Sequence, residues 1–185
     1  MMNSNDTQDT PDAGAPLFSH WVDVSDIEPT GREIALSLDE DARKALAGAF
    51  ALIDLPLVEV RATVWAITMG ITLQFHLRAK VVQQCVVTLE PVPGDVDETI
   101  TLHYTPRAVL EESHRVVEFA DEDDPPEPLD GDRLDLGAAV AEHLALSLDP
   151  FPRKADAVLP ESATDGQHKA TGAFAVLAKL KRDET

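Results

Sequence analysis

Two adjacent runs of alternating apolar and polar residues constrain the fold of this chain more than any other feature. Between residues 58 and 66 the apolar side chains stand at even positions, and between residues 71 and 81 they stand at odd positions. A two-residue period is typical of a β-strand with one buried face. Gly70 lies between the runs and favours a turn. The sequence therefore predicts a long β-hairpin.

The second run continues into the stretch VVQQCVVTLEPV, which holds the only cysteine of the chain. If the alternation is carried forward, Cys85, Val87 and Leu89 lie on the apolar face, and Gln83 is the exception. A single strand of this length is unusual, so a bend or bulge is expected at Gln83 and Gln84.

Further strands are predicted on both sides of the hairpin. Residues 90–95, with the sequence EPVPGD, indicate a turn, and residues 96–104 indicate a strand that returns along the hairpin. Short strands are expected within residues 17–27 and 31–38. Successive hairpins predict an antiparallel meander of about five or six strands.

A first helix is predicted within residues 39–53, where apolar residues recur at helical spacing and acidic residues fill the first turn. Either Ser37 or Asp39 can cap its N-terminus. Pro56 is expected to close this helical region.

A second helix is predicted within residues 135–148, with Asp135 as its N-cap and an apolar stripe along one side. It should stop before Pro150, because a proline disfavours helical backbone in the residue that precedes it. The predicted fold class is α+β, an antiparallel sheet packed by two main helices and flanked by flexible termini.

The chain divides into four predicted segments. Residues 1–16 are polar, lack periodicity and predict a disordered leader. Residues 17–152 form a single α+β domain, residues 153–171 a flexible linker, and residues 172–185 a short C-terminal amphipathic helix. This last helix is expected either to pack on the core of the chain or to serve as a short anchor for another protein.

Charge is the strongest global property of the sequence. The 185 residues include 34 acidic and 15 basic ones, for a formal net charge of −19. Such a surface repels phosphates, so broad contact with nucleic acid is disfavoured and a basic protein is the better-matched partner. The acidic run that contains Asp121–Asp124 has two interpretations, a solvated loop or a site for that partner.

No motif for catalysis, nucleotide binding or metal binding is present. The chain lacks G-x-S-x-G and both common phosphate-binding loops, and its six histidines form no H-x-x-x-H pair. The apolar neighbours of Cys85 predict a buried, protonated and unreactive thiol. We therefore expect no enzyme activity, cofactor or metal. The sequence has no apolar run long enough to span a membrane and no signal peptide, so a cytoplasmic location is expected.

Three stretches, in order along the chain, resemble the YceD family of large ribosomal RNA subunit accumulation proteins. They are QQCVVTLEPV, LDLGAAVAEHLALSLDPFPRK and GAFAVLAKLK. The resemblance covers about residues 17–182. It implies a non-enzymatic role in the accumulation of 23S ribosomal RNA and in assembly of the large subunit, in bacteria and plastids.

Many members of that family carry the motif C-x-R-C-L, from which this chain departs. The first cysteine corresponds to Cys85 and the leucine to Leu89, but Val87 and Thr88 replace the arginine and the second cysteine. A metal site built on a cysteine pair is therefore not expected here. In the second helix and after it, the matching positions are Asp135, Leu136, Glu142, Leu144, Leu146, Pro150 and Pro152.

Together, charge and resemblance suggest that an acidic surface holds a basic ribosomal protein or contacts the pre-ribosomal large subunit. The candidate partner-binding residues are Glu90, Asp121, Glu122, Asp123, Asp124, Glu142, Phe174, Leu177 and Lys181. Two alternatives are an RNA-processing enzyme with clustered carboxylates and a direct RNA-binding module. The basic residues available to the RNA-binding module are Arg61, Arg78, Lys80, Lys179, Lys181 and Arg182.

Overall fold

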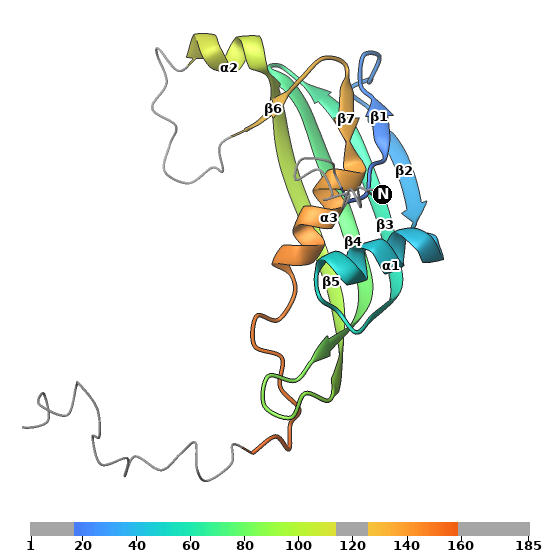
Figure 1. The fold of residues 1–185 in the computed structure, drawn as a ribbon. Helices are drawn as coiled ribbons and strands as arrows, with labels where there is room; N and C mark the ends of the chain where they lie inside the picture. Colours follow the sequence, from blue (N-terminus) through green and yellow to red (C-terminus); the bar gives the residue numbers. More distant parts are fainter. Residues whose placement is uncertain (1–16, 114–125, 159–185) are drawn as a thin grey trace, which may run out of the picture.

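The computed structural model describes residues 17–113 and 126–158 of the chain (Figure 1). The predicted leader, the acids Asp121–Asp124 and the predicted C-terminal helix lie outside these residues. Among the described residues, no helix is both long enough and apolar enough to cross a membrane.

The described residues build a five-stranded sheet in the order β2-β3-β4-β5-β6. Its strands are β2 (Arg32–Ser37), β3 (Asp54–Ile67), β4 (Gly70–Gln84), β5 (Pro91–Pro106) and β6 (Glu127–Leu129). A separate antiparallel pair joins β1 (Trp21–Asp23) to β7 (Arg133–Asp135). The predicted hairpin is confirmed as β3 and β4, with Ile67 opposite Gly70 at its turn.

The sheet is mixed, which corrects the prediction of a purely antiparallel meander. The first four strands are antiparallel, but β6 runs parallel to β5, with Tyr104 opposite Glu127. Two adjacent parallel strands must be joined by a long connection, and residues 107–126 join β5 to β6. The strand β6 has only three residues, which is too short for an alternating pattern that would predict a strand there.

Three helices occur among the described residues, one more than predicted. They are α1 (Glu40–Ala49), α2 (Arg107–Ser113) and α3 (Leu136–Leu146), and only α1 and α3 exceed two turns. Both of these lie on the same face of the five-stranded sheet (Figure 1). The unpredicted helix α2 is short and lies in the crossover between β5 and β6.

The two ends of α1 show one confirmed and one wrong prediction. Asp39 is the N-cap, because its carboxylate accepts a hydrogen bond from the Ala42 N–H at 2.8 Å. The helix ends at Ala49, earlier than Pro56 suggests. Its last carbonyls are bonded by the N–H groups of Ala51 and Leu52, and Ala51 adopts a left-handed φ of 53°. This pattern is a Schellman motif, in which backbone hydrogen bonds terminate the helix.

The core lies between the sheet and the two long helices. The alternating apolar positions of β3 and β4 are buried there, as the hairpin pattern predicts. Phe75 is the largest fully buried side chain, and its ring meets that of His143 in α3 edge-on, with centroids 5.7 Å apart. Leu46 of α1 and Leu144 of α3 are also fully buried. The long helices therefore share one apolar face of the hairpin.

The prediction for residues 85–95 needs correction. Strand β4 ends at Gln84, the reversal occurs at once over residues 85–90, and Pro91 already belongs to β5. Cys85 is buried, as expected, but Leu89 is 66% exposed and does not share its face. The two-residue alternation applies only to extended backbone, so it says nothing about side chains in a turn.

The N-terminus of α3 is held against the segment that precedes β1. The Asp135 carboxylate caps the helix by accepting hydrogen bonds from the Ala138 N–H at 3.1 Å and the His20 N–H at 2.9 Å. A Cβ atom on Gly137 would come within 3.0 Å of backbone atoms of Ser19 and His20. The sequence D-L-G is therefore explained by a cap, a buried leucine and a close backbone approach.

Replacing Gly137 by Ala should lower the free energy of unfolding by about 2 kcal/mol, because the backbone of Ser19 and His20 cannot move away from the new methyl group. The matched control is Gly48→Ala, since a Cβ at Gly48 in α1 meets nothing within 4 Å. That change should raise stability by about 0.5–1 kcal/mol through helix propensity alone. Urea unfolding of both variants checks the difference, and equal stabilisation by the two alanines would contradict it.

Candidate functional site

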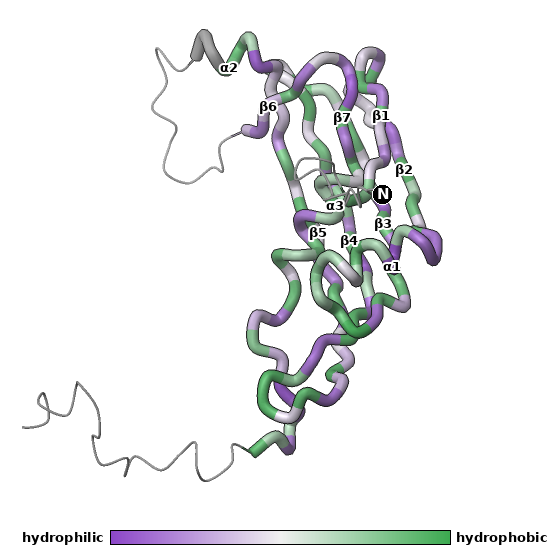
Figure 2. The backbone as a smooth tube through the Cα atoms, in the orientation of Figure 1, coloured by the Kyte–Doolittle hydropathy of each residue, from purple (hydrophilic) through white to green (hydrophobic). Residues whose placement is uncertain are grey.

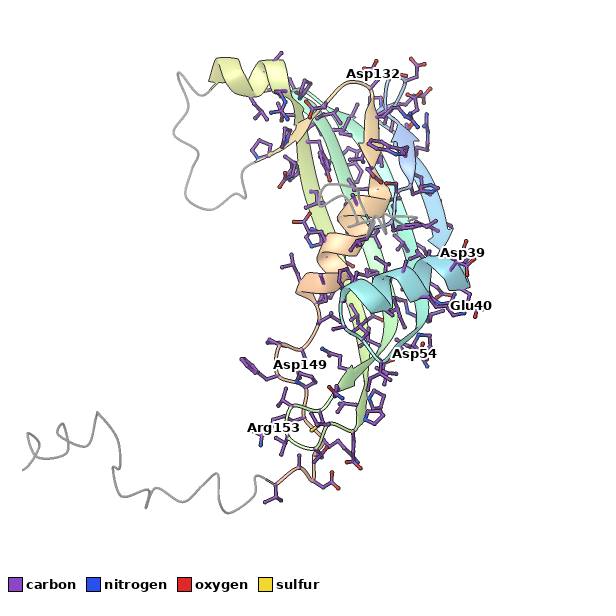
Figure 3. The ribbon with its side chains drawn as sticks, in the orientation of Figure 1. Asp39, Glu40, Asp54, Asp132, Asp149 and Arg153 are labelled. Carbon is purple, nitrogen blue, oxygen red and sulfur yellow. The ribbon has the colours of Figure 1, made fainter. Side chains whose placement is uncertain are left out.

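Two segments far apart in the sequence meet at the end of the sheet where β4 turns into β5. They are residues 83–90 and residues 149–154, and we call them together the tip. The Val86 N–H donates to the Pro152 carbonyl at 2.9 Å, and the Gln83 side-chain amide donates to the Asp149 carbonyl at 2.8 Å. Figure 3 shows Asp149 and Arg153 in the segment beside this turn. The chain that leaves α3 is thereby fastened to the β4–β5 turn.

An ion pair adds a third connection between the two segments. The Lys154 ammonium lies 2.9 Å from a carboxylate oxygen of Glu90. Its hydrogen bond to Glu90 raises the pKa of Lys154, and the same bond lowers the pKa of Glu90. Both side chains are substantially exposed, so solvent screens the pair and it contributes little to stability. Its main effect is to orient the two segments.

Hydrogen bonds within the turn fix its shape around Cys85. The Cys85 N–H donates to the Glu90 carbonyl at 2.8 Å, and the Leu89 N–H donates to the Cys85 carbonyl at 2.9 Å. The Thr88 N–H points at the Cys85 sulfur, 3.4 Å away. The turn is thus wrapped around a buried thiol.

The environment of this thiol differs from the one expected from sequence. A hydrogen bond from the Thr88 side chain, together with backbone N–H groups of Lys154, Thr88 and Val87, lowers the pKa of Cys85 to about 6. Burial acts in the opposite direction but is outweighed. The sequence-based prediction of a protonated thiol did not include these donors, because they come from the folded turn and from residue 154. Complete burial still keeps the sulfur from reagents.

The surface of the tip presents three large apolar side chains among its polar ones. Val86 is 51%, Leu89 66% and Phe151 71% exposed. Hydrophobic residues form much of the connection between β4 and β5 (Figure 2). Leu89 also has a φ of 61°, a left-handed conformation that is uncommon for a residue with a branched apolar side chain. Strain and exposed apolar groups at a well-fastened turn are typical of a contact surface.

The structure divides the family-motif positions between the two ends of α3. The tip contains Cys85, Leu89, Glu90, Pro150 and Pro152. The N-cap of α3 is Asp135, its first residue Leu136 is buried, and Glu142, just past its middle, is exposed. Leu146, in the last turn of α3, is exposed. The candidates Asp121, Glu122, Asp123, Asp124, Phe174, Leu177 and Lys181 lie outside the described residues.

Three residues of the tip were not predicted to take part in it. They are Gln83, Phe151 and Lys154. Gln83 could have been recognised from the sequence, because it interrupts the apolar alternation. In the structure its side-chain amide donates a hydrogen bond to the Asp149 carbonyl. Lys154 gave no signal, because its partner Glu90 lies 64 residues away in the chain. No local pattern marked Phe151.

The face of the sheet opposite the long helices carries Arg61, Arg78 and Lys80 of the RNA-binding alternative, whereas Lys179, Lys181 and Arg182 lie outside the described residues. Arg78 lies 3.8 Å from Glu59 and 3.6 Å from Asp97, so carboxylates on both neighbouring strands balance its charge. His76 is 2.7 Å from Asp97, and this hydrogen bond lowers the pKa of Asp97. Cations and carboxylates alternate across the strands, so this face is mixed in charge.

The described residues contain no group of three or more His, Cys, Asp or Glu placed to hold a metal ion. The carboxylate cluster expected of an RNA-processing enzyme therefore has no counterpart within residues 17–113 and 126–158.

Comparison with known proteins gives one match. A family model described as "Large ribosomal RNA subunit accumulation protein YceD" matches residues 73–181. The match spans β4, both segments of the tip and α3. No curated protein and no solved structure matches the chain.

The lowered pKa of Cys85 predicts a specific dependence of stability on pH. The thiol ionises near pH 6 in the folded chain and near its ordinary value of 9.0 when unfolded. Between these values unfolding takes up a proton, so the contribution of Cys85 to stability grows as pH rises from 6 to 9 and is absent below pH 6. Urea unfolding of the wild type and of Cys85→Ala should show a stability difference that grows over this interval.

Thr88→Val provides the control, because it removes the hydroxyl that contributes most to the lowered pKa. In the Thr88→Val background, the stability difference between the chain with Cys85 and the chain with Cys85→Ala should begin to grow at a higher pH. A difference between the wild type and Cys85→Ala that stays constant from pH 6 to pH 9 would show that the folded thiol is not ionised in this range.

Proposed function

The chain belongs to the YceD family of large ribosomal RNA subunit accumulation proteins, and from this premise we propose that it is a non-enzymatic assembly factor of the large ribosomal subunit. It promotes accumulation of 23S ribosomal RNA in the cytoplasm by binding a basic ribosomal protein. The observation that carries the proposal is the family match over residues 73–181, which includes both segments of the tip.

The charge of the chain supports a basic protein as the partner. A net charge of −19 attracts a basic chain over a distance and repels the phosphates of ribosomal RNA. Association rates rise when the fields of two partners are complementary, and they fall as salt screens the charges. The acidic chain is therefore suited to hold a ribosomal protein that would otherwise bind RNA without selectivity.

The tip supplies the short-range contacts of the proposed complex. Exposed Leu89 and Phe151 present apolar surface that a partner can bury, and the hydrogen bonds of the tip hold this surface in a fixed conformation. Buried apolar anchors contribute most of the binding energy in protein interfaces, whereas charges at the rim mainly set the rate. The tip and the acidic run thus have separate roles in the same contact.

Removing the acidic run tests the electrostatic part of this proposal. Replacing residues 121–124 by Ser should weaken co-sedimentation of the tagged protein with large-subunit precursors and lower 23S ribosomal RNA levels, because four charges that attract the partner are lost. Sucrose gradients and quantification of 23S ribosomal RNA in cells that carry only the variant measure both effects.

The matched control removes four charges elsewhere, with Ser at Asp26, Glu33, Asp41 and Asp95. These acids are exposed and lie in four different parts of the fold. The control should retain most of the co-sedimentation. The proposal fails if the wild type sediments with no ribosomal particle, and the partner is RNA if nuclease treatment releases the protein while ribosomal proteins do not crosslink to it.

Leu89→Asn tests the tip. Asparagine tolerates the left-handed conformation, so the free energy of unfolding should rise by about 0.5–1 kcal/mol, while capture of the partner should weaken because the apolar anchor is gone. Ala51→Asn is the control, since Ala51 has the same left-handed conformation at the end of α1. It should stabilise the fold and leave capture unchanged. Equal capture by both variants would exclude Leu89 from the contact.

A further inference from the structure

A second surface feature lies at the opposite end of α3 from the tip. A cavity of about 270 Å³ opens between the β1–β7 pair, the edge of the sheet at β5 and β6, and the first turns of α3. Figure 1 shows these elements together near the end of the sheet that carries α2. The residues that matter for its chemistry are Trp21, Tyr104, Asp130, Arg133, Asp135 and Glu142.

Two aromatic side chains form walls of this cavity. Trp21 is 53% exposed although it is the largest kind of apolar side chain, and Tyr104 is half-buried in β5. The guanidinium of Arg133 lies 5.3 Å from the centre of the Trp21 ring. An arginine of the chain thus already stacks on one of these walls, which shows that a guanidinium group fits against it.

Carboxylates give the cavity a negative field. Asp130 is neutralised by Arg107 through two hydrogen bonds of 2.7 and 2.8 Å, and Asp135 accepts the N–H groups at the start of α3. Glu142 and the neighbouring Glu127 have no ion pair within the described part of the chain.

The effect of these charges is visible at Tyr104. Burial, followed by the charges of Glu127, Glu142 and Asp135, raises the pKa of Tyr104 to about 12. The carboxylates therefore act across the cavity on a group in its wall, and a cation placed there would be stabilised by the same charges.

We propose that this cavity binds an arginine side chain of the basic protein partner, with the guanidinium at Glu142 and the methylene stem against Trp21 and Tyr104, while Glu127, opposite Tyr104 in β6, adds to the negative field. This inference rests on the proposed function, because it assigns a contact to the same partner. The volume lies just below the range of about 300–1,000 Å³ that is usual for small-molecule sites, and it fits one long side chain. Arginine is favoured over lysine because its planar group both stacks on aromatic rings and bridges carboxylates.

The test uses a peptide, Ac-Gly-Arg-Gly-Arg-Gly-Arg-Gly-amide, and the fluorescence of Trp21. The chain has two tryptophans, so Trp65→Phe provides a background in which only Trp21 reports. Added peptide should change the Trp21 emission with saturation, at an affinity that falls with salt. The same peptide with citrulline in place of arginine has nearly the same shape without the charge, and it should leave the emission unchanged.

Substitutions locate the contact. Glu142→Gln should weaken the binding of the arginine peptide about fivefold, in line with the loss of a charged hydrogen bond at a partly exposed site. Glu127→Gln should weaken it less, because Glu127 lies beside the cavity and contributes only its charge. The matched control Glu33→Gln removes the same charge from exposed β2 and should change the affinity less than twofold. Arg133→Gln should tighten binding, because it removes a positive charge that opposes the incoming arginine.

Several results would overturn the assignment. These are binding of the citrulline peptide with equal affinity, binding of a lysine peptide as tightly as the arginine peptide, or equal effects of Glu142→Gln and Glu33→Gln. Failure of this inference is distinguishable from failure of the proposed function. If the wild type sediments with large-subunit precursors while the peptide does not affect Trp21, only the cavity assignment is lost. If no co-sedimentation occurs, the proposed function itself is lost.

Discussion

Burial of one face of the β3–β4 hairpin is the constraint on which the rest of the structure depends. The apolar positions of both strands project to one side, so α1 and α3 must both pack there to remove them from water. Phe75 marks the centre of this arrangement, since it is fully buried and contacts His143 of α3. Among residues 17–113 and 126–158, no long helix lies on the opposite face of the sheet, and charged residues there pair across strands.

Helix α3 connects the two surface features, and the motif residues hold both of its ends. At its N-terminus, the Asp135 cap and the close approach at Gly137 fasten it to the segment before β1. Beyond its C-terminus, the Pro152 carbonyl and Lys154 fasten the following chain to the β4–β5 turn. The motif that identifies the family therefore sets the position of one helix across the sheet. The physical consequence is a fixed separation between the cavity and the tip.

A partner with basic side chains and an apolar patch would satisfy both features at once. The tip offers exposed leucine and phenylalanine, while the cavity offers aromatic walls and the carboxylate of Glu142, which has no ion pair among the described residues. Such a division between apolar anchoring and charge selection is common at protein interfaces. The buried thiol at the centre of the tip belongs to the architecture of the turn, because the donors that lower its pKa come from Val87 and Thr88 of the turn and from Lys154 of the second segment.

The sequence by itself determined the features that depend on local periodicity. The hairpin, the caps Asp39 and Asp135, the inward position of Cys85 and the apolar stripe of α3 all follow from neighbours a few residues apart. It also identified residues in both segments of the tip, namely Cys85, Leu89, Glu90, Pro150 and Pro152, but not that the two segments meet. Only the tertiary structure decided the parallel pairing of β6, the exposure of Leu89, the lowered pKa of the thiol and the meeting of residues 83–90 with residues 149–154. These depend on groups that are distant in the chain, and no local pattern records which distant groups will supply a turn with its hydrogen bonds.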